Sequence, residues 1–397
     1  MRLTILVSGA ALAVSAACSP HRVARASEQH RDSTRFTGVE RLLLSAVDSH
    51  AFPGAVLQVG FKGRVVYKTA AGHYGDDDPR PVSDSTVYDL ASLTKVIGLT
   101  TAVMLLAAEG KIDLNRPVAD YVPRFSGPDK DRVLVRHLLT HSSGLPAWRP
   151  LHLETATRDE AVDSVLAAQL ESQPGEAYRY SDLGAITLGL AVERIGGQSL
   201  DVILQERVFG PLGMDWTRYR PPQDWIDHIA PTEDDPWRGR VVRGEVHDEN
   251  AVRLGGVSAH AGLFSMAPDL ARFAQWMLDA YHGRLAPDGP LYIPAEIVRE
   301  FVRLQPGPEG STRALGWDTP SREGSSAGTL MSPDSFGHTG FTGTSLWIDP
   351  HRELFIVLLT NRVHPTRDNN AIRQIRGLVA DSVVAALSPQ ARPHPGR

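Results

Sequence analysis

The chain has 397 residues, of which 42% are hydrophobic and 22% charged, as in an ordinary globular protein with one large domain or two lobes sharing a cleft. Its formal net charge is −5 and it has no block of basic residues, so nothing indicates a nucleic-acid partner. Cys18 is the only cysteine, which excludes an internal disulfide.

The first residues have the pattern of a targeting segment. Arg2 supplies positive charge, Leu3–Val14 is apolar, and Ser15-Ala16-Ala17 is a small-residue cleavage site. The apolar run is too short to span a bilayer comfortably as a permanent helix. We therefore expect an exported protein in which residues 1–17 are a signal peptide and residues 18–36 a polar tether.

Cys18 directly follows the cleavage site. This position resembles the lipobox of bacterial lipoproteins, in which the cysteine is acylated. Ser15 stands where a lipobox usually has Leu or Val, so simple secretion is the alternative. With lipid on Cys18, the protein would be anchored at the periplasm or cell envelope, and we expect membrane contact only through that anchor.

Hydrophobic periodicity predicts the elements that follow. An amphipathic helix over 37–50 precedes a hairpin of strands 55–61 and 65–69, which turns at Lys62-Gly63. The segment 72–84, with three consecutive aspartates, predicts a solvated loop rather than a metal site. The later predicted helices cover 92–108, 158–170, 186–195, 200–208, 268–281, 297–302 and 369–387, and the late strands cover 345–348 and 354–360.

Ser92-Leu93-Thr94-Lys95 opens the long apolar helix and carries the first chemical signal. Lys95 lies one turn after Ser92 on the same helix face. A serine hydroxyl needs a base to take its proton, and a nearby ammonium can steer that transfer. The N–H groups at the helix start also suit an oxyanion beside Ser92. Alone the pattern is weak, because serine is a common helix cap.

Two further motifs fit the same acyl-transfer site. Tyr180-Ser181-Asp182 follows a Pro-Gly turn and precedes a helix, whereas His338-Thr339-Gly340, followed by Phe341, leads into a strand. The three motifs, in this order, resemble those of the serine β-lactamase and penicillin-binding protein family. The likeness is to its class C-like branch, with esterases and D-alanyl-D-alanine carboxypeptidases, and covers roughly residues 37–387.

The resemblance implies an α+β fold, an α/β sandwich plus a helical lobe. In such a fold an antiparallel sheet is flanked by terminal helices and packs against an inserted, mostly helical lobe. We therefore expect one domain over 37–390, with a sheet lobe at about 37–95 and 335–390 and a helical lobe at about 96–334. The site would lie between the lobes.

The resemblance also implies roles for individual residues. Ser92 would be the nucleophile, Tyr180 would accept its proton, and Lys95 would hold Tyr180 charged. The backbone N–H groups of Ser92 and Phe341 would form the oxyanion hole. Chemistry of this kind requires no cofactor and no metal.

Asp182, His338, Thr339 and Gly340 would line the substrate site, and the first two depart from the family pattern. Asp182 replaces the usual Asn, and His338 replaces the usual Lys. Histidine is mostly neutral at pH 7 at its ordinary pKa, but a carboxylate of Asp182 nearby would raise the pKa of His338. A charged His338 would then bind substrate carboxylates best at low pH, whereas a neutral ring would only pack and form hydrogen bonds.

Other histidines offer weaker signals. His247, Asp248 and His260 could be metal ligands, but their spacing matches no zinc signature, so hydrogen bonding or cleft lining is expected. His141, which lies in a turn beside two serines, is expected to be structural.

The sequence thus predicts an exported serine hydrolase that forms an acyl-enzyme on Ser92. The expected substrate is a D-alanyl peptide of the cell wall or a related amide or ester. An esterase is the alternative among enzymes, and a β-lactamase would need fast deacylation, which no motif reports. A non-catalytic envelope protein that binds peptidoglycan is the rival from another class.

Overall fold

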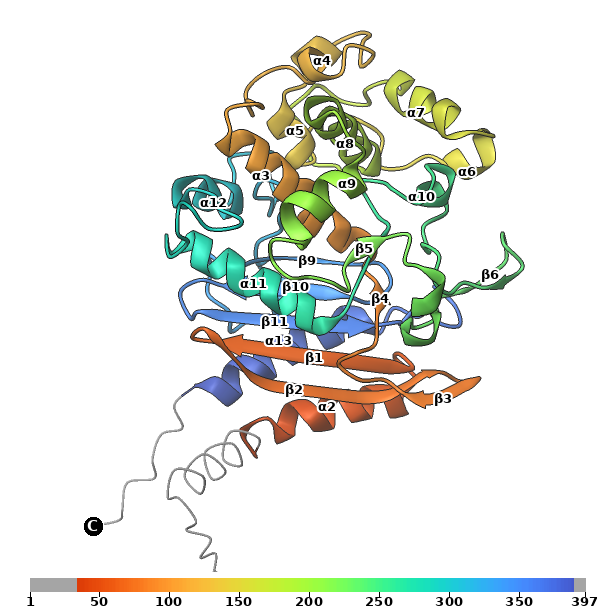
Figure 1. Ribbon diagram of the computed structural model, residues 1–397, viewed down its shortest axis with the longest axis vertical. Helices are drawn as coiled ribbons and strands as arrows, with labels where there is room; N and C mark the ends of the chain where they lie inside the picture. Colours follow the sequence, from red (N-terminus) through yellow and green to blue (C-terminus); the bar gives the residue numbers. More distant parts are fainter. Residues whose placement is uncertain (1–33, 389–397) are drawn as a thin grey trace, which may run out of the picture.

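An antiparallel sheet of six strands organises residues 34–388, the part of the chain that the computed structural model describes (Figure 1). The strand order is β3-β2-β1-β11-β10-β9, and every neighbouring pair is antiparallel. The strands are β1 (Gly54–Phe61), β2 (Arg64–Gly75), β3 (Asp78–Pro81), β9 (Phe336–Thr339), β10 (Ser345–Asp349) and β11 (Leu354–Thr360).

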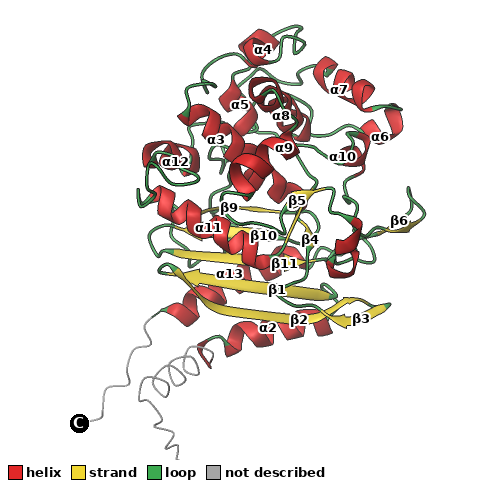
Figure 2. Cartoon of the chain, viewed as in Figure 1, coloured by secondary structure: helices red, strands yellow, loops and turns green. Residues whose placement is uncertain are grey.

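β1, near the start of the described chain, and β11, near its end, are neighbours in the middle of this sheet. β1 pairs with β11 from Ala55 opposite Thr360 to Phe61 opposite Leu354. Everything between β3 and β9 is therefore inserted into the sheet layer, and Figure 2 shows that this insertion is mostly helical. The predicted α+β class is confirmed.

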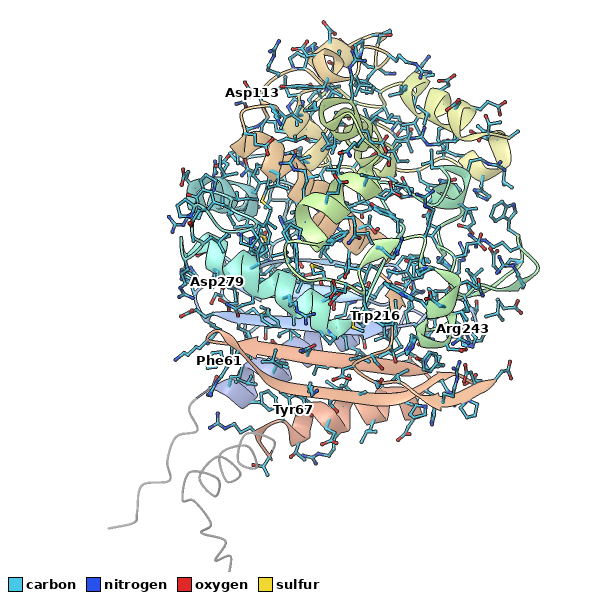
Figure 3. All side chains as sticks on the ribbon, in the orientation of Figure 1. Phe61, Tyr67, Asp113, Trp216, Arg243 and Asp279 are labelled. Atoms are coloured by element: carbon cyan, nitrogen blue, oxygen red, sulfur yellow. The ribbon has the colours of Figure 1, made fainter. Side chains whose placement is uncertain are left out.

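β11 is buried along its whole length because both faces of the sheet are covered. Leu354, Ile356 and Leu358 pack into one hydrophobic cluster. Phe355 and Val357 alternate with them and pack into the other cluster. Side chains fill the space between the sheet and the helices on either side (Figure 3).

Helices α2 (Thr37–Asp48) and α13 (Ile372–Leu387) contact each other and cover one face of the sheet. α11 (Ala267–Tyr281) covers the other face against β1 and β11, although our sequence boundaries placed it in the helical lobe. Phe36, placed in the polar tether, is 1% exposed and stacks on Tyr67 of β2 at 4.2 Å between ring centroids. The sheet layer therefore begins before residue 37. It also includes α11, which lies outside the predicted boundaries of the sheet lobe.

The helical lobe and its surroundings complete the fold. The remaining helices are α3 (Thr101–Ala108), α4 (Val118–Tyr121), α5 (Val135–Leu139), α6 (Leu151–Glu154), α7 (Arg158–Ala167), α8 (Asp182–Gly196), α9 (Leu200–Leu204), α10 (Glu249–Arg253) and α12 (Ala295–Val302). A small sheet joins β4 (Tyr88–Asp89), β8 (Leu263–Ser265) and β5 (Arg218–Tyr219), while β6 (Asp234–Asp235) pairs with β7 (Arg240–Val241).

The segment 72–84 is not the polar loop that we predicted. β2 continues to Gly75, and β3 pairs with it as a short edge strand. Asp78 forms ion pairs with Arg80 and Arg243, so this carboxylate is engaged with arginines. The strand was missed because its pairing with β2 supplies the order that its polar composition does not.

The predicted helix at Ser92 is irregular. A 3₁₀ turn over Ala91–Leu93 leads into a π-helical segment over Lys95–Thr100 before α3 begins. The hydroxyl of Thr100 donates to the carbonyl of Lys95 at 2.8 Å, a side-chain bond that suits the wider segment. The stretch 91–108 is long and apolar enough to cross a membrane, but 83% of it is buried, so it is the core helix of the fold.

Gly340, at the end of β9, brings this strand against the turn that carries Ser92. A Cβ at Gly340 would overlap Oγ1 of Thr344 and the carbonyl oxygen of Leu90. Thr344 Oγ1 itself donates to that carbonyl at 3.0 Å. Glycine is therefore required here for close approach of two backbones.

We expect Gly340→Ala to lower the free energy of unfolding by about 1–3 kcal/mol and to abolish turnover, because the strand must move away from the Ser92 turn. Gly38→Ala is the matched control, since a Cβ there meets nothing within 4 Å in α2. Urea unfolding should show that control as neutral or slightly stabilised. Wild-type stability and activity in Gly340→Ala would contradict the close-approach argument.

Candidate active site

The turn before Ser92 is held in a strained conformation. Ala91 has φ of 45°, which a residue with a side chain rarely adopts. Asp89 fixes it, because its Oδ1 accepts from the Ala91 N–H at 2.8 Å and its Oδ2 accepts from the His247 N–H at 2.7 Å. Thr342, just after β9, donates to the Asp89 carbonyl at 2.7 Å. These bonds set the direction of the Ser92 side chain.

Lys95 is the centre of the polar contacts at the site. Its ammonium is 3% exposed and lies 3.0 Å from Ser92 Oγ. Asp182 Oδ1 lies 2.7 Å from Nζ, and the His260 carbonyl accepts from Nζ at 2.9 Å. The ammonium also lies 4.9 Å from the centroid of the Tyr180 ring. The structure thus brings together Ser92, Lys95, Tyr180 and Asp182, from motifs far apart in the sequence.

Lys95 stays protonated in this setting. Burial works to lower its pKa, but the charges of Asp182 and Tyr180 outweigh burial and hold that pKa above its usual value. An ammonium in this state donates hydrogen bonds and cannot accept the proton of Ser92. Asp182 was predicted to line the substrate site; in the structure, its contact is an ion pair with Lys95.

Tyr180 is placed by the start of α8. Ser181 caps this helix, with its hydroxyl accepting from the Gly184 N–H at 3.0 Å. The Ser181 N–H donates to Nδ1 of His141 at 3.1 Å, and the His141 ring lies 4.5 Å from the Tyr180 ring. His141 therefore orients the Tyr180 segment, which extends the merely structural role expected from its turn. Burial lowers the pKa of His141 well below its usual value.

His338 does not have the raised pKa that we expected from a nearby Asp182, and the neutral ring, which was the alternative, fits the structure. Burial lowers the pKa of His338 well below its usual value, and the cations of Arg313 and Lys95 lower it further. Its Nδ1 lies 2.8 Å from the Thr339 carbonyl, so this nitrogen carries the proton, and the buried Nε2 has no partner among the described residues. The prediction failed because Asp182 faces Lys95, whereas cations surround His338.

Arg313 is a site residue that the sequence did not reveal. Its guanidinium lies 5.2 Å from the centroid of the Tyr180 ring, and its side chain is 9% exposed. Nε donates to the hydroxyl of Tyr178 at 3.1 Å, whereas Nη1 is buried with no hydrogen-bond partner within 34–388. Burial works to lower its pKa, but Asp318 and the tyrosines raise it. Nη2 lies 3.7 Å from Oδ2 of Asp318, so the site has a cation that is held by an acidic neighbour and keeps one unpaired nitrogen, Nη1.

The turn after β9 completes the site. Thr339 is partly exposed, and the Phe341 side chain is 48% exposed. Arg376 of α13 donates to the carbonyls of Gly340 and Thr344 at 2.6 and 2.8 Å, which anchors this turn. Burial and neighbouring arginines lower the pKa of Arg376 to about 9, so it still carries its charge at neutral pH.

His247, Asp248 and His260 form hydrogen-bond networks. His260 lies between Asp248 and Ser258, with Nε2 2.9 Å from Oδ1 and Nδ1 2.7 Å from Oγ. This arrangement fixes the His260 carbonyl that accepts from Lys95. Nε2 of His247 lies 2.9 Å from Glu233. Within residues 34–388, no three His, Cys, Asp or Glu side chains are grouped to hold a metal ion.

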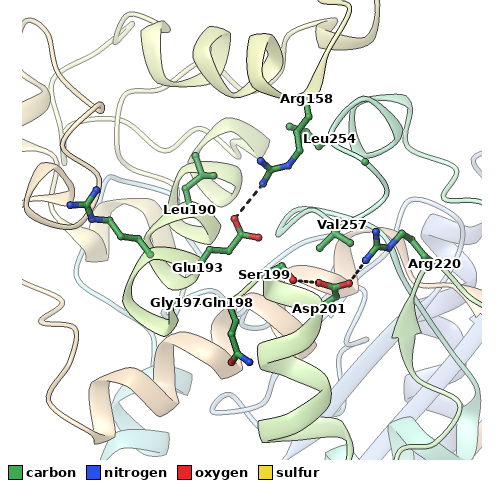
Figure 4. A pocket seen from close by; sticks show the side chains of 12 residues that line it. Arg158, Leu190, Glu193, Gly197, Gln198, Ser199, Asp201, Arg220, Leu254 and Val257 are labelled. Atoms are coloured by element: carbon green, nitrogen blue, oxygen red, sulfur yellow. Dashed lines mark hydrogen bonds and ion pairs between the residues drawn. The ribbon is translucent and has the colours of Figure 1, made fainter.

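A wide surface cavity of about 810 Å³ lies apart from these residues (Figure 4). Its wall includes the Arg158–Glu193 ion pair at 3.4 Å and the Arg220–Asp201 ion pair. These arginines are neutralised by their acidic neighbours, and none of the predicted site residues lines the cavity. The chemistry is therefore concentrated around Lys95.

Comparison with known proteins agrees with this geometry. A model of the family described as Beta-lactamase matches residues 39–381. A provisionally named D-alanyl-D-alanine carboxypeptidase of Escherichia coli O157:H7 is 32% identical over 405 residues, which cover 89% of this chain and 91% of that protein. An N-acetylmuramyl-L-alanine amidase of Bacillus subtilis (strain 168) is 33% identical over 356 residues, which cover 79% of this chain and 78% of that protein.

Solved structures share the fold. A class C beta-lactamase superimposes with a TM-score of 0.72 at 20% identity, over 90% of this chain and 98% of its own. A penicillin-binding protein homologue from Caulobacter crescentus superimposes with a TM-score of 0.70 at 20% identity, over 89% of this chain and 98% of its own. Likeness at these identities concerns architecture alone.

We expect His338→Asn to weaken the acid sensitivity of folding. The imidazole is neutral in the folded chain, whereas the unfolded chain takes up a proton near the ordinary pKa of about 6.5. The free energy of unfolding should therefore be complete above that pH and fall as the pH decreases below it. Asparagine can donate to the Thr339 carbonyl but does not titrate.

Urea unfolding of both proteins between neutral pH and mildly acidic pH measures the slope. The variant should lose stability less steeply than wild type, although His141 still contributes in the same direction. Identical slopes would show that the pKa of His338 is the same in the folded and the unfolded chain, which would contradict the prediction.

Proposed function

Because the chain belongs to the beta-lactamase family of serine hydrolases, we propose that Ser92 forms an acyl-enzyme with a D-alanyl peptide of the cell wall. The reaction is the removal of a terminal D-alanine, a D-alanyl-D-alanine carboxypeptidase activity. One observation carries this proposal: Arg313, a buried cation whose Nη1 has no hydrogen-bond partner among the described residues, lies 5.2 Å from the Tyr180 ring, and Lys95 lies 4.9 Å from the same ring.

The protonation state of Lys95 determines which residue accepts the proton of Ser92. Ser92 Oγ attacks the carbonyl carbon of the scissile amide, and its proton passes to the oxygen of Tyr180, because Lys95 is already protonated. Lys95 donates to Ser92 Oγ and stabilises negative charge on Tyr180. The N–H groups of Ser92 and Phe341 stabilise the tetrahedral oxyanion.

Collapse of that intermediate breaks the amide bond. The proton held by Tyr180 moves to the departing amine of D-alanine, which leaves the acyl group as an ester on Ser92. Water then attacks the ester with Tyr180 as the base again, and hydrolysis regenerates Ser92.

Arg313 supplies the carboxylate recognition that His338 cannot. A free D-alanine carboxylate lies close to the scissile bond in such a peptide, so its binding group must be near Ser92. A guanidinium N–H donates a charge-assisted hydrogen bond to a carboxylate, and the group remains charged across the accessible pH range. This argument favours an anionic peptide over the neutral substrate of an esterase.

We expect Ser92→Ala to abolish release of D-alanine from an acyl-D-alanyl-D-alanine peptide while leaving the protein folded. The wild-type chain should release D-alanine and become labelled by an activated acyl donor at Ser92. Mass spectrometry of the intact protein and an assay for free D-alanine measure both effects. Retained hydrolysis in the variant would assign the chemistry elsewhere.

Arg313→Gln separates the carboxypeptidase from the esterase alternative. The variant should lose on the order of 10²-fold in kcat/KM for the peptide with a free carboxylate, as expected when a charged hydrogen-bond partner is removed. It should lose much less for the same peptide with an amidated terminus or for a p-nitrophenyl ester. Equal losses on all three substrates would contradict carboxylate binding by Arg313.

We also propose that the protein is exported and attached to the bacterial envelope through lipid on Cys18. Residues 1–33, which contain Cys18 and the predicted signal peptide, lie outside the described part of the structure. The support is the sequence pattern around the cleavage site.

In a bacterial host, wild-type protein should incorporate labelled fatty acid and fractionate with membranes. Cys18→Ser should remove the label and release the protein. Wild-type protein that is unlabelled and soluble would contradict the lipid anchor.

A further inference from the structure

Exposed aromatic side chains are concentrated around the site. Among residues 34–388, five are exposed by more than a third of their surface: Trp148, Tyr178, Trp237, Tyr292 and Phe341. Tyr178 contacts Arg313, and Phe341 directly follows Gly340. Trp148 and Trp237 have no role in the chemistry proposed above, and exposed apolar rings that gather in one patch mark a candidate binding surface.

Trp148 and Trp237 form one aromatic shelf with His152 between them. The His152 ring lies 6.2 Å from the Trp148 ring and 5.1 Å from the Trp237 ring, between centroids. Trp148 comes from the segment that leads into α6 and His152 from α6 itself, whereas Trp237 comes from the turn between β6 and β7. The indole rings are 49% and 40% exposed, so both offer a face to a ligand.

Hydrogen bonds hold the shelf in place. Asn250 Oδ1 accepts from the His152 N–H at 3.2 Å and lies 3.1 Å from its Nδ1. The Asn250 amide donates to the Arg149 carbonyl at 2.8 Å, next to Trp148. The guanidinium of Arg238 lies 5.1 Å from the Trp237 ring and is paired with buried Asp235. The rings are therefore preorganised for binding.

The shelf adjoins the nucleophile from two directions. The carbonyl of Ala147, one residue before Trp148, accepts from the N–H of Asp182 at 2.9 Å, and Asp182 pairs with Lys95. On the other side, Arg238 donates to the His247 carbonyl at 3.2 Å, and the His247 ring stacks near Phe341. A ligand bound at Ser92 can therefore extend onto the shelf.

We propose that this shelf binds a pyranose ring of the substrate, namely the N-acetylmuramyl sugar that carries the peptide of the cell wall. The proposal rests on the function proposed above and specifies its substrate as a glycopeptide. The two exposed indoles, tilted by 51° and 76° to the imidazole between them, offer apolar faces to the C–H groups of a sugar ring, and the guanidinium of Arg238 lies beside Trp237. An aliphatic patch, as expected for a protein partner, is not what these residues form.

The test compares two substrates that differ only in the sugar: N-acetylmuramyl pentapeptide and the N-acetylated pentapeptide without it. In wild type, kcat/KM should be higher for the sugar-bearing peptide. Trp148→Ala and Trp237→Ala should each lower the ratio of the two kcat/KM values roughly tenfold. Leu153→Ala is the matched control, because Leu153 lies in α6, is 68% exposed and should leave the ratio unchanged.

A wild-type ratio near one, or an equal loss on both substrates in the tryptophan variants, would overturn the shelf. Binding is measured separately on the full chain with Ser92→Ala, by calorimetric titration with N-acetylmuramyl-L-alanyl-D-isoglutamine. The titration should show binding that Trp237→Ala weakens. Binding of the sugar ligand without turnover of either peptide would support the shelf and contradict the carboxypeptidase activity. Turnover of both peptides without binding of the sugar ligand would support the carboxypeptidase activity and contradict the shelf.

Discussion

The buried ammonium of Lys95 is the constraint on which the site depends. A charge with 3% exposure is costly unless it is paired and hydrogen-bonded. Its partners are Ser92 in the same turn, Asp182 at the start of α8, and the carbonyl of His260 in the segment before β8. The packing that supplies hydrogen-bond and ion-pair partners to this one cation therefore also assembles the site. A shift of α8 would move Asp182 away from Lys95 and would disrupt the site.

The two departures from the family pattern are explained by the charges around them. Asp182, where Asn is usual, balances Lys95 directly. A lysine at position 338 would place another cation in surroundings that already contain Arg313 and Lys95, both of which lower the pKa of His338. A neutral histidine avoids that repulsion. Arg313, which lies in a different segment of the chain, therefore supplies the positive charge that a lysine supplies in the usual pattern.

The sequence was informative where interactions are local. The apolar run of β11 and the spacing of Ser92 and Lys95 carry their own signals. Arg313 lies in an irregular stretch without periodicity, and only the fold brings it to Tyr180. The charge of His338 was mispredicted because pKa depends on burial and on distant cations, which spacing does not report. β3 depends likewise on a contact beyond its own residues, its pairing with β2.

The position of α2 determines how the molecule would be oriented if it were held by its N-terminal end. α2 and α13 lie together on one face of the sheet, whereas the helical lobe lies beyond the opposite face (Figure 1). The described chain starts at Thr34, beside α2. A molecule held near Thr34 would thus have its sheet between that point and the helical lobe, which includes α6 (Figure 1). If the lipid anchor and the cell-wall substrate proposed above are both correct, such an orientation would let the polymer reach the helical lobe without passing between the protein and the surface that holds it.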